Sequence, residues 1–361
     1  MKRISRKSLI LFLAITLGVV SIFAFVGCNK KQTKGKPTEV QFMLDWTPNT
    51  NHTGIYVAKA LGYYKDEGLN VNIAQPGDTG TSQYVAASNR NKAIFGVDFQ
   101  EQMYANYFAG VNVKAIAAIQ QHNTSGILSL KRDGINSPKD MVGKKHATWG
   151  LPVEQTIIED LIKQDGGIIP TDTNELYNTN YITDSVAALE EKDKTKINSA
   201  WVYECWDLVK AKMKDANKFN YFAFKDINKI LDWYTPVLIG NEDYMKHNPT
   251  VTKKFLRATK KGYEYAINNP EKAAEILMQS APELQSERDF IIESQKLISK
   301  KYYNAEAGEK WGYIDEERWQ RFYEYLNSLK DVIQRKMHTI GDATQITDIP
   351  TNFGLTKEYL D

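Results

Sequence analysis

The chain has 361 residues, of which 42% are hydrophobic and 25% are charged, and its formal net charge is +2. This length is enough for two domains, each with its own hydrophobic core. The near balance of charges disfavours a nucleic-acid partner, because domains that bind nucleic acids carry a strongly basic surface.

The first 28 residues have the pattern of an export signal. Four basic residues lie within 1–8, and the 19 residues of 9–27 carry no charge. This apolar run ends in Phe25-Val26-Gly27-Cys28, which is similar to a bacterial lipobox except that Phe25 replaces the usual leucine. We predict a signal peptide over 1–27 and a lipidated Cys28, which would hold the protein on the extracytoplasmic face of the cell membrane. The alternative is an uncleaved anchor helix, since an apolar run of this length can just span a bilayer.

A basic and polar segment follows directly, and we predict a solvated tether over 28–38. If Cys28 is acylated, the other cysteine, Cys205, has no partner, so we expect no disulfide. No spacing of cysteine and histidine fits a zinc site. We therefore predict neither a metal nor a cofactor.

Short apolar runs alternate with helical patterns from residue 39 to about residue 240. Such alternation predicts an α/β fold with mostly parallel sheets and helices on both faces, and the length indicates two such lobes. Beyond Asn241 the pattern is helical to about Arg335, and we expect the last 25 or so residues to form a loosely structured tail. The strands are predicted at 39–44, 67–74, 92–97, 113–120, 127–131, 143–148, 196–202, 221–225 and 236–240.

The first strand leads into a polar and aromatic join at 45–54, before a predicted helix. The join contains Trp46, Asn49 and His52, which offer a ring face and hydrogen-bonding groups to a small aromatic ligand. In open α/β sheets, ligands lie outside the carboxyl ends of strands. We therefore predict a ligand site here. The alternative is that Trp46 packs over the core and His52 is a hydrogen bonder at the helix start.

Polar residues also follow two later strands, so we expect one shared rim. Asp98 follows the strand at 92–97, and Gln121 and Asn123 follow the strand at 113–120. Asp98 could instead cap its helix, and the other two could be hinge residues between lobes.

A third candidate group lies at a helix start near 81–82. Thr81 or Ser82 can cap this helix, and hydroxyl groups after a glycine at such a position can also bind an anion. Capping is the more common explanation, because no fuller phosphate-loop pattern is present.

Two segments together resemble a known family. The segment 44–71, LDWTPNTNHTGIYVAKALGYYKDEGLNV, resembles the opening of exported solute-binding proteins of ABC importers, in the branch that carries pyrimidine precursors of thiamine. SPKDMVGKK at 137–145 is similar to the opening of their second lobe. The resemblance covers about 39–305.

The resemblance implies a two-lobed periplasmic-binding-protein-like fold of type II, with two mixed sheets and a ligand cleft between the lobes. It places lobe 1 at 39–125, lobe 2 at 126–234, and the return to lobe 1 with the C-terminal helices at 235–361. The implied partners are a small heteroaromatic ligand, with a pyrimidine favoured, and an ABC permease. We expect a monomer.

The resemblance also implies roles for individual residues. Trp46 would stack on the ligand ring, while Asn49 and His52 would donate to ring nitrogens. Tyr203 and Glu204 match the second-lobe position where these binders place a carboxylate, which can accept two hydrogen bonds from an aminopyrimidine edge. The remaining candidates around the cleft are Asp98, Gln121, Trp149, Trp233 and Tyr234.

The branch also contains a fungal enzyme that makes the thiamine pyrimidine from its own histidine and pyridoxal phosphate. That enzyme carries a lysine where this chain has Asp98, the donor histidine where it has Gln102, and a cysteine-rich segment where it has 231–234. We therefore predict no catalytic residue. The alternatives are the same receptor class for riboflavin, another heteroaromatic compound or a sulfonate, and, less favoured, a pyrimidine synthase.

Overall fold

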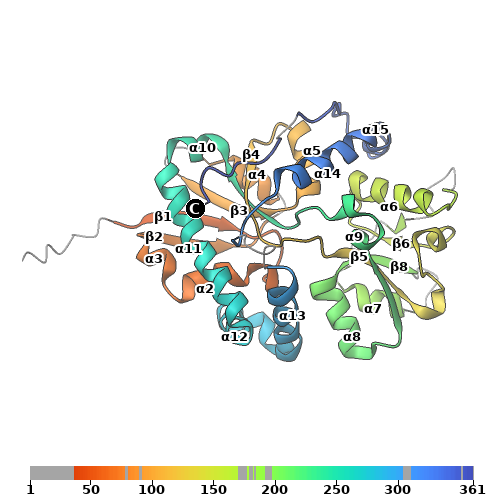
Figure 1. Cartoon of the computed structure of the whole chain (residues 1–361), viewed down its shortest axis with the longest axis horizontal. Helices are drawn as coiled ribbons and strands as arrows, with labels where there is room; N and C mark the ends of the chain where they lie inside the picture. The colour runs from red at the N-terminus through yellow and green to blue at the C-terminus, as the bar shows by residue number, and fades with distance from the viewer. Residues whose placement is uncertain are drawn as a thin grey trace, which may run out of the picture. The chain divides into compact units, whose positions relative to one another are not determined.

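The computed structural model describes residues 36–77, 80–88, 92–169, 182, 184–191, 197–303, 310–350 and 353–360, and the backbone of 177–178. The predicted signal peptide, Cys28 and most of the tether lie outside these residues. One compact unit extends from Thr38 to Asp361, and Figure 1 shows its elements.

Lobe 1 is built on a mixed five-stranded sheet. Its strand order is β2-β1-β3-β10-β4. Strand β1 is parallel to β2 and β3, whereas β10 is antiparallel to both of its neighbours. Because β10 comes from far along the chain, the polypeptide must leave this sheet and return to it. The strands are β1 (Thr38–Met43), β2 (Leu69–Ala74), β3 (Ala93–Asp98), β4 (Val113–Ala118) and β10 (Val237–Asn241).

Helices α2, α3 and α11 share a hydrophobic core with this sheet. Phe95 of the sheet stacks on Phe255 of α11, with ring centroids 4.3 Å apart. Helix α11 also approaches α2 closely, because a Cβ atom on Gly262 would lie 2.0 Å from the carbonyl oxygen of Gly54. The helices of lobe 1 up to α13 are η1 (Thr50–His52), α2 (Thr53–Ala60), α3 (Tyr63–Asp66), α4 (Thr81–Ala86), α5 (Gln100–Phe108), α10 (Glu242–His247), α11 (Pro249–Asn268), α12 (Pro270–Ser280), η6 (Pro282–Glu287) and α13 (Arg288–Lys301).

Lobe 2 is built on a second mixed sheet with the order β7-β6-β8-β5-β9. Strand β6 is parallel to β7 and β8, and β5 is antiparallel to β8 and β9. Trp201 of β8 packs with the core of α6, whereas the next residue, Val202, packs with the core of α7 and α8. This alternation is expected of a strand covered on both faces. The strands are β5 (Ser125–Leu130), β6 (His146–Ala147), β7 (Tyr177–Asn178), β8 (Ser199–Tyr203) and β9 (Phe219–Ala223).

Short helices join these strands. The longest, α6, begins at Pro152, a residue suited to the first turn of a helix. The helices of lobe 2 are η2 (Lys131–Asp133), η3 (Pro138–Met141), α6 (Pro152–Gln164), α7 (Ser185–Glu190), η4 (Glu204–Leu208), α8 (Val209–Asp215), α9 (Phe224–Ile227) and η5 (Lys229–Leu231).

The last helices, α14 (Glu316–Ser328) and α15 (Lys330–Thr339), connect the lobes. Tyr325 donates a hydrogen bond to Asp160 of α6 at 2.7 Å, and Lys336 pairs with Glu159 at 2.6 Å. The prediction of a loosely structured tail is wrong over its last part. Ala115 of β4 donates to the carbonyl of Gly354, and Leu355 forms a β-bridge with Ala115, so the tail covers the edge of β4.

The predicted alternation of strands and helices up to about residue 240, followed by helices, is confirmed. The chain passes from the first sheet to the second between Ala118 and Ser125, and it returns between Ala223 and Val237. Within the described ranges, every helix is too short or too polar to cross a membrane.

Candidate functional site

The join after β1 is held by His52, which is completely buried. Its Nδ1 accepts the backbone N–H of Asn49 at 3.2 Å, so its proton lies on Nε2, which contacts the carboxylate of Asp45. The Asn49 side chain accepts the N–H of Asn51 and donates to the carbonyl of Thr47. His52 and Asn49 thus form the loop and orient Asp45, an acid that the sequence analysis did not single out.

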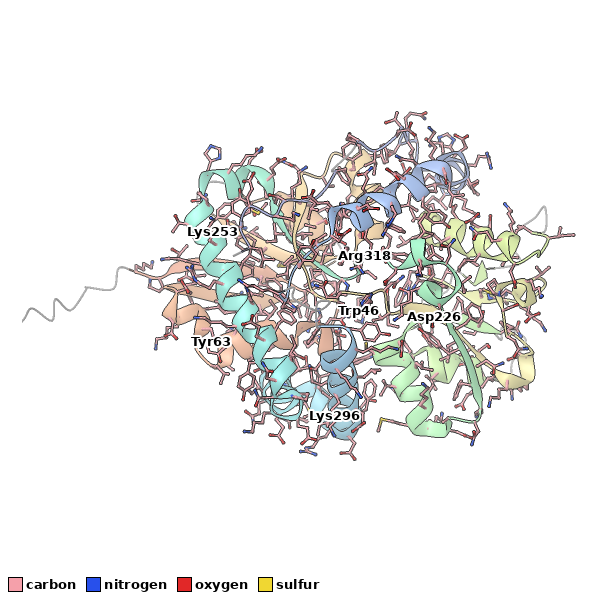
Figure 2. All side chains as sticks on the ribbon, in the orientation of Figure 1. Trp46, Tyr63, Asp226, Lys253, Lys296 and Arg318 are labelled. Atoms are coloured by element: carbon pink, nitrogen blue, oxygen red, sulfur yellow. The ribbon has the colours of Figure 1, made fainter. Side chains whose placement is uncertain are left out.

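Trp46 and Trp149 meet between the lobes. Their ring centroids are 6.4 Å apart and their planes lie at 68°, an edge-to-face arrangement. Their exposed fractions are 45% and 42%, although large hydrophobic side chains are usually buried. Figure 2 shows Trp46 near the middle of the molecule, between the two lobes. This pair therefore presents aromatic surface from both lobes at one place.

Glu154 holds the loop that carries Trp149. Its carboxylate accepts the N–H of Trp149 at 2.8 Å and that of Leu151 at 3.4 Å, at the start of α6. A carboxylate at a helix N-terminus also interacts favourably with the helix dipole. Glu154 is nonetheless 5% exposed, so it lies in a poorly solvated environment.

Buried carboxyl groups from both lobes lie near each other. Burial raises the pKa of Asp98 to about 6, that of Glu101 to about 7 and that of Glu154 to about 8. The charge of Glu101 in lobe 1 contributes to the raised pKa of Glu154 in lobe 2. Burial first, and then the charges of Glu101, Glu154 and Asp45, also raise the pKa of Tyr203. We name Asp45, Asp98, Glu101 and Glu154 the interlobe acids.

Hydroxyl and amide groups support the interlobe acids. Asp98 accepts hydrogen bonds from the hydroxyl of Ser82, from the N–H of Phe99 at 2.8 Å and from Asn106 at 3.1 Å. Thr81 donates instead to the carbonyl of Leu44 at 2.6 Å. Both hydroxyl groups considered for anion binding therefore have protein acceptors, and one of those acceptors is itself an acid.

Glu204 lies in a different group from its neighbour Tyr203. It contacts Lys301 at 2.8 Å and the hydroxyl of Tyr302, both at the end of α13. Burial would raise the pKa of Glu204, but the hydrogen bonds from Lys301 and Tyr302 hold it below its usual value. Lys225 donates to the same tyrosine hydroxyl at 2.9 Å. Glu204 is thus part of a polar contact between the lobes.

Trp233 and Tyr234 are buried in the core, where packing covers their rings. Trp233 stacks on Phe322 of α14 with centroids 4.5 Å apart, and its indole N–H donates to Glu101 at 2.8 Å. The guanidinium of Arg318 lies 3.8 Å from the centroid of the Tyr234 ring. The second crossing packs against α14. The prediction that these rings close over a ligand is therefore wrong, because both are buried. Trp233 instead positions an interlobe acid.

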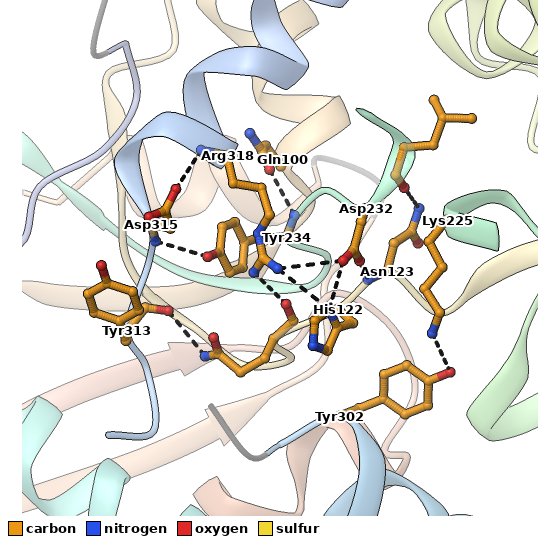
Figure 3. A network of polar contacts seen from close by, with 12 residues as sticks. Gln100, His122, Asn123, Lys225, Asp232, Tyr234, Tyr302, Tyr313, Asp315 and Arg318 are labelled. Atoms are coloured by element: carbon orange, nitrogen blue, oxygen red, sulfur yellow. Dashed lines mark hydrogen bonds and ion pairs between the residues drawn. The ribbon is translucent and has the colours of Figure 1, made fainter. Parts of the chain in front are cut away.

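A polar network joins the two crossings between the sheets (Figure 3). Asp232 accepts a hydrogen bond from the N–H of Asn123 at 2.9 Å and contacts His122 at 2.7 Å and Arg318 at 3.5 Å. Arg318 also donates to the carbonyl of Gln121, whose side chain donates to the carbonyl of Tyr313 at 3.1 Å. Gln121 and Asn123 are thus held in the crossings. The sequence gives no local signal for Arg318, which lies almost 200 residues away.

A surface cavity of about 340 Å³ lies elsewhere, and none of the predicted site residues lines it. Its lining comes from α8, the end of η6 and the start of α13. The described part of the chain brings no three His, Cys, Asp or Glu side chains together in a way that could hold a metal ion. The two tryptophans and the interlobe acids therefore remain the best-defined candidate for a ligand site.

Comparisons with known proteins show the family and the fold of the chain. The family described as NMT1/THI5 like matches residues 49–273. A formylaminopyrimidine-binding protein from Halalkalibacterium halodurans is 24% identical over 315 residues, covering 86% of this chain and 90% of that protein. A 4-amino-5-hydroxymethyl-2-methylpyrimidine phosphate synthase from Legionella pneumophila is 28% identical over 253 residues, covering 69% of this chain and 76% of that protein.

The fold also has relatives among solved structures. A Candida albicans protein with the generic periplasmic binding protein fold aligns with a TM-score of 0.55 and 15% identity, over 89% of this chain and 96% of that chain. The predicted two-lobed fold with two mixed sheets is confirmed.

Proposed function

Because the chain belongs to the NMT1/THI5-like family, we propose that it is an exported solute-binding protein that delivers a thiamine-related pyrimidine to an ABC importer. The ligand would be held between the lobes, and the closed form would dock on the permease. The observation that carries the proposal is the Trp46–Trp149 pair next to the interlobe acids. Asp45 directly precedes Trp46, and Glu154 accepts the N–H of Trp149.

An aminopyrimidine suits these groups chemically. Its flat ring can stack on an exposed indole, while its amine and a protonated ring nitrogen can donate to a carboxylate. Each hydrogen bond to a charged group contributes about 1.5–3 kcal/mol. The relative from Halalkalibacterium halodurans, named for formylaminopyrimidine binding, supports this ligand class.

The interlobe acids argue against an anionic ligand. A sulfonate would bring negative charge next to Asp98, whose carboxyl already accepts the Ser82 hydroxyl. Like charges repel each other, and the repulsion is stronger in a buried site because the effective dielectric constant is lower there. We therefore rank a sulfonate below a pyrimidine. Riboflavin remains an alternative heteroaromatic ligand, and a yellow colour in the purified protein would support it.

A binding role is also proposed over catalysis, although some relatives are named as pyrimidine synthases. Asp98 occupies the position where the resemblance to the fungal enzyme requires a lysine. A carboxyl group cannot form the Schiff base that a lysine amine forms. Gln102 likewise lacks the imidazole that the donor histidine would provide.

The anchoring part of the proposal rests on the sequence before Thr38. A lipidated Cys28 and a tether over 28–38 would hold a monomer on the extracytoplasmic face of the membrane. Mass spectrometry of the N-terminal peptide tests this directly. An unmodified Cys28, or an uncleaved 1–27 segment, would contradict it.

The ligand proposal is tested by mass spectrometry of small molecules released from protein purified without refolding. Thermal unfolding with a panel of pyrimidines and flavins provides a second measurement. A ligand at 100 times its Kd should stabilise the folded state by about 2.7 kcal/mol. No stabilisation by any pyrimidine at millimolar excess would overturn the ligand assignment.

A further inference from the structure

The outer face of α11 is basic, although the folded part of the chain is acidic overall. Residues 1–37 contain eight of the 46 Lys and Arg residues and none of the 44 acids, so the remaining chain has a formal net charge of −6. Helix α11 contains one acid, Glu264, and five basic residues: Lys253, Lys254, Arg257, Lys260 and Lys261.

The five basic residues lie on one side of the helix. They recur at intervals of three and four residues, which places them on one face. The opposite face is apolar and buried, with Phe255 and Tyr263 in the core of lobe 1. Figure 2 labels Lys253 on this helix. The basic face therefore points away from the core.

This face lies close to the point where the tether joins the fold. The N–H of Thr38, at the start of β1, donates to the carbonyl of Gly68 at 2.9 Å. The adjacent Glu67 binds Arg257 of α11 through two hydrogen bonds of 2.7 and 2.9 Å. Two successive contacts thus connect the chain entry to the middle of the basic face.

The ligand site lies toward the other end of α11. Tyr263 donates to the carbonyl of Asn51 in the join at 2.7 Å. Tyr263 lies six positions after Arg257, a rise of about 9 Å along the helix. Lys253, Lys254 and Arg257 therefore precede, along the helix, the turn that contacts the join.

We propose that the basic face of α11 docks on an anionic phospholipid surface and, together with the tether, orients the anchored protein on its membrane. The inference rests on the proposed lipidation of Cys28. The ten positions from Cys28 to Pro37 include four lysines and no acid, so the tether that leads into Thr38 is also positively charged. A basic patch beside a lipid anchor is a common second attachment to an anionic membrane.

The charge pattern favours lipid over a protein partner. Lysine side chains provide flexible point charges, which suit a fluid surface of phosphate groups. Glu67 pairs with Arg257, so the excess charge is assigned to Lys253, Lys254 and Lys261. Docked in this way, the join with Trp46 would face away from the bilayer.

The test uses the mature acylated protein in vesicles of phosphatidylcholine, with or without phosphatidylglycerol. A fluorophore is attached at Thr250→Cys, an exposed position at the start of α11. Labelling is specific because Cys205 is buried and Cys28 would be acylated. We expect a lipid-headgroup quencher to reduce fluorescence several-fold more in vesicles containing phosphatidylglycerol, and high salt to remove the difference.

The variant Lys253→Gln/Lys254→Gln/Lys261→Gln should abolish the difference between the vesicles. The matched control, Lys139→Gln/Lys163→Gln/Lys212→Gln, removes the same charge from exposed positions of lobe 2 and should retain it. Equal quenching in both vesicles, or full quenching in the α11 variant, would overturn the proposal. Both variants should bind pyrimidine like the wild type, and the mass of the Cys28 peptide reports anchoring separately.

Discussion

Trp46 and Trp149 approach each other edge to face from opposite lobes, with ring centroids 6.4 Å apart. The contact exists only while the lobes are close together. Each ring remains more than two-fifths exposed, so neither residue is needed to fill a core. This separation of roles allows the aromatic pair to be altered without unfolding the chain.

Trp46→Ala should abolish detectable ligand binding, a loss of about 100-fold or more, or ~3 kcal/mol. The free energy of unfolding should change by less than about 1 kcal/mol, because the side chain is largely exposed. Calorimetric titration and urea unfolding measure the two quantities. Ile168→Ala, which removes the most exposed large hydrophobic side chain of lobe 2, is the control and should alter neither. Undiminished affinity in Trp46→Ala would return Trp46 to a packing role.

Stability should fall as the pH rises through the range set by Glu154. Burial raises the pKa of this acid from 4.5 to about 8, so the folded chain binds more protons than the unfolded chain between these values. Glu154→Gln removes the titration and retains an acceptor for the N–H of Trp149. We expect its free energy of unfolding to gain on the order of 1–3 kcal/mol relative to the wild type between about pH 5.5 and 8.

Urea unfolding at several pH values measures this effect. The control Glu324→Gln, at an exposed position of α14, should leave the change of the free energy of unfolding with pH as in the wild type. If the free energy of unfolding of Glu154→Gln changes with pH as it does in the wild type, Glu154 does not contribute to that pH dependence.

Arg318→Ala should destabilise the crossings between the lobes. The change removes the contact with Asp232, the hydrogen bond to Gln121 and the stacking on Tyr234, and it leaves a half-buried carboxylate with fewer partners. We expect a loss of about 2–4 kcal/mol in the free energy of unfolding. Arg318→Lys should restore little, because one ammonium group cannot make all three contacts.

The control for Arg318 lies one turn along α14. Arg321→Ala removes an exposed arginine that pairs with Glu317 and should change stability by less than about 0.5 kcal/mol. Equal effects of Arg318→Ala and Arg321→Ala would refute a structural role for the network.

Glu204 has two assignments that a double-mutant cycle separates. If it acts through the contact with Lys301, Glu204→Gln and Lys301→Ala should each weaken ligand affinity several-fold, with a coupling of about 0.5–1 kcal/mol. If Glu204 binds the ligand directly, as the family resemblance implies, Glu204→Gln should cost far more than Lys301→Ala. Calorimetric titration of the four proteins decides between them.

The sequence predicts the order of strands and helices because the apolar runs are short and separated by turn residues. It also leads to Trp46 and Trp149, because both follow strands. Side-chain direction at a strand end is harder to predict. Tyr203 and Glu204 are consecutive, yet the charges of the interlobe acids act on Tyr203, whereas Glu204 contacts Lys301 of α13.

Long-range partners have no local signal. His52 resembles a ligand group in the sequence, but its two nitrogens are used within the join and orient Asp45. Arg318 is one of two arginines on the amphipathic helix α14, and only the fold brings it against the two crossings. In the sequence, Glu154 resembles an ordinary residue of a first helical turn, and only the fold, through burial and then the charge of Glu101, raises its pKa.

The position of β10 affects the order in which the chain can fold. This strand pairs with both β3 and β4 in the sheet of lobe 1, yet it follows all of lobe 2 in the sequence. During synthesis, β4 therefore lacks its neighbour until about 120 further residues have left the ribosome. Because non-local pairing forms slowly, the sheet of lobe 1 is completed only after the whole of lobe 2 has been made.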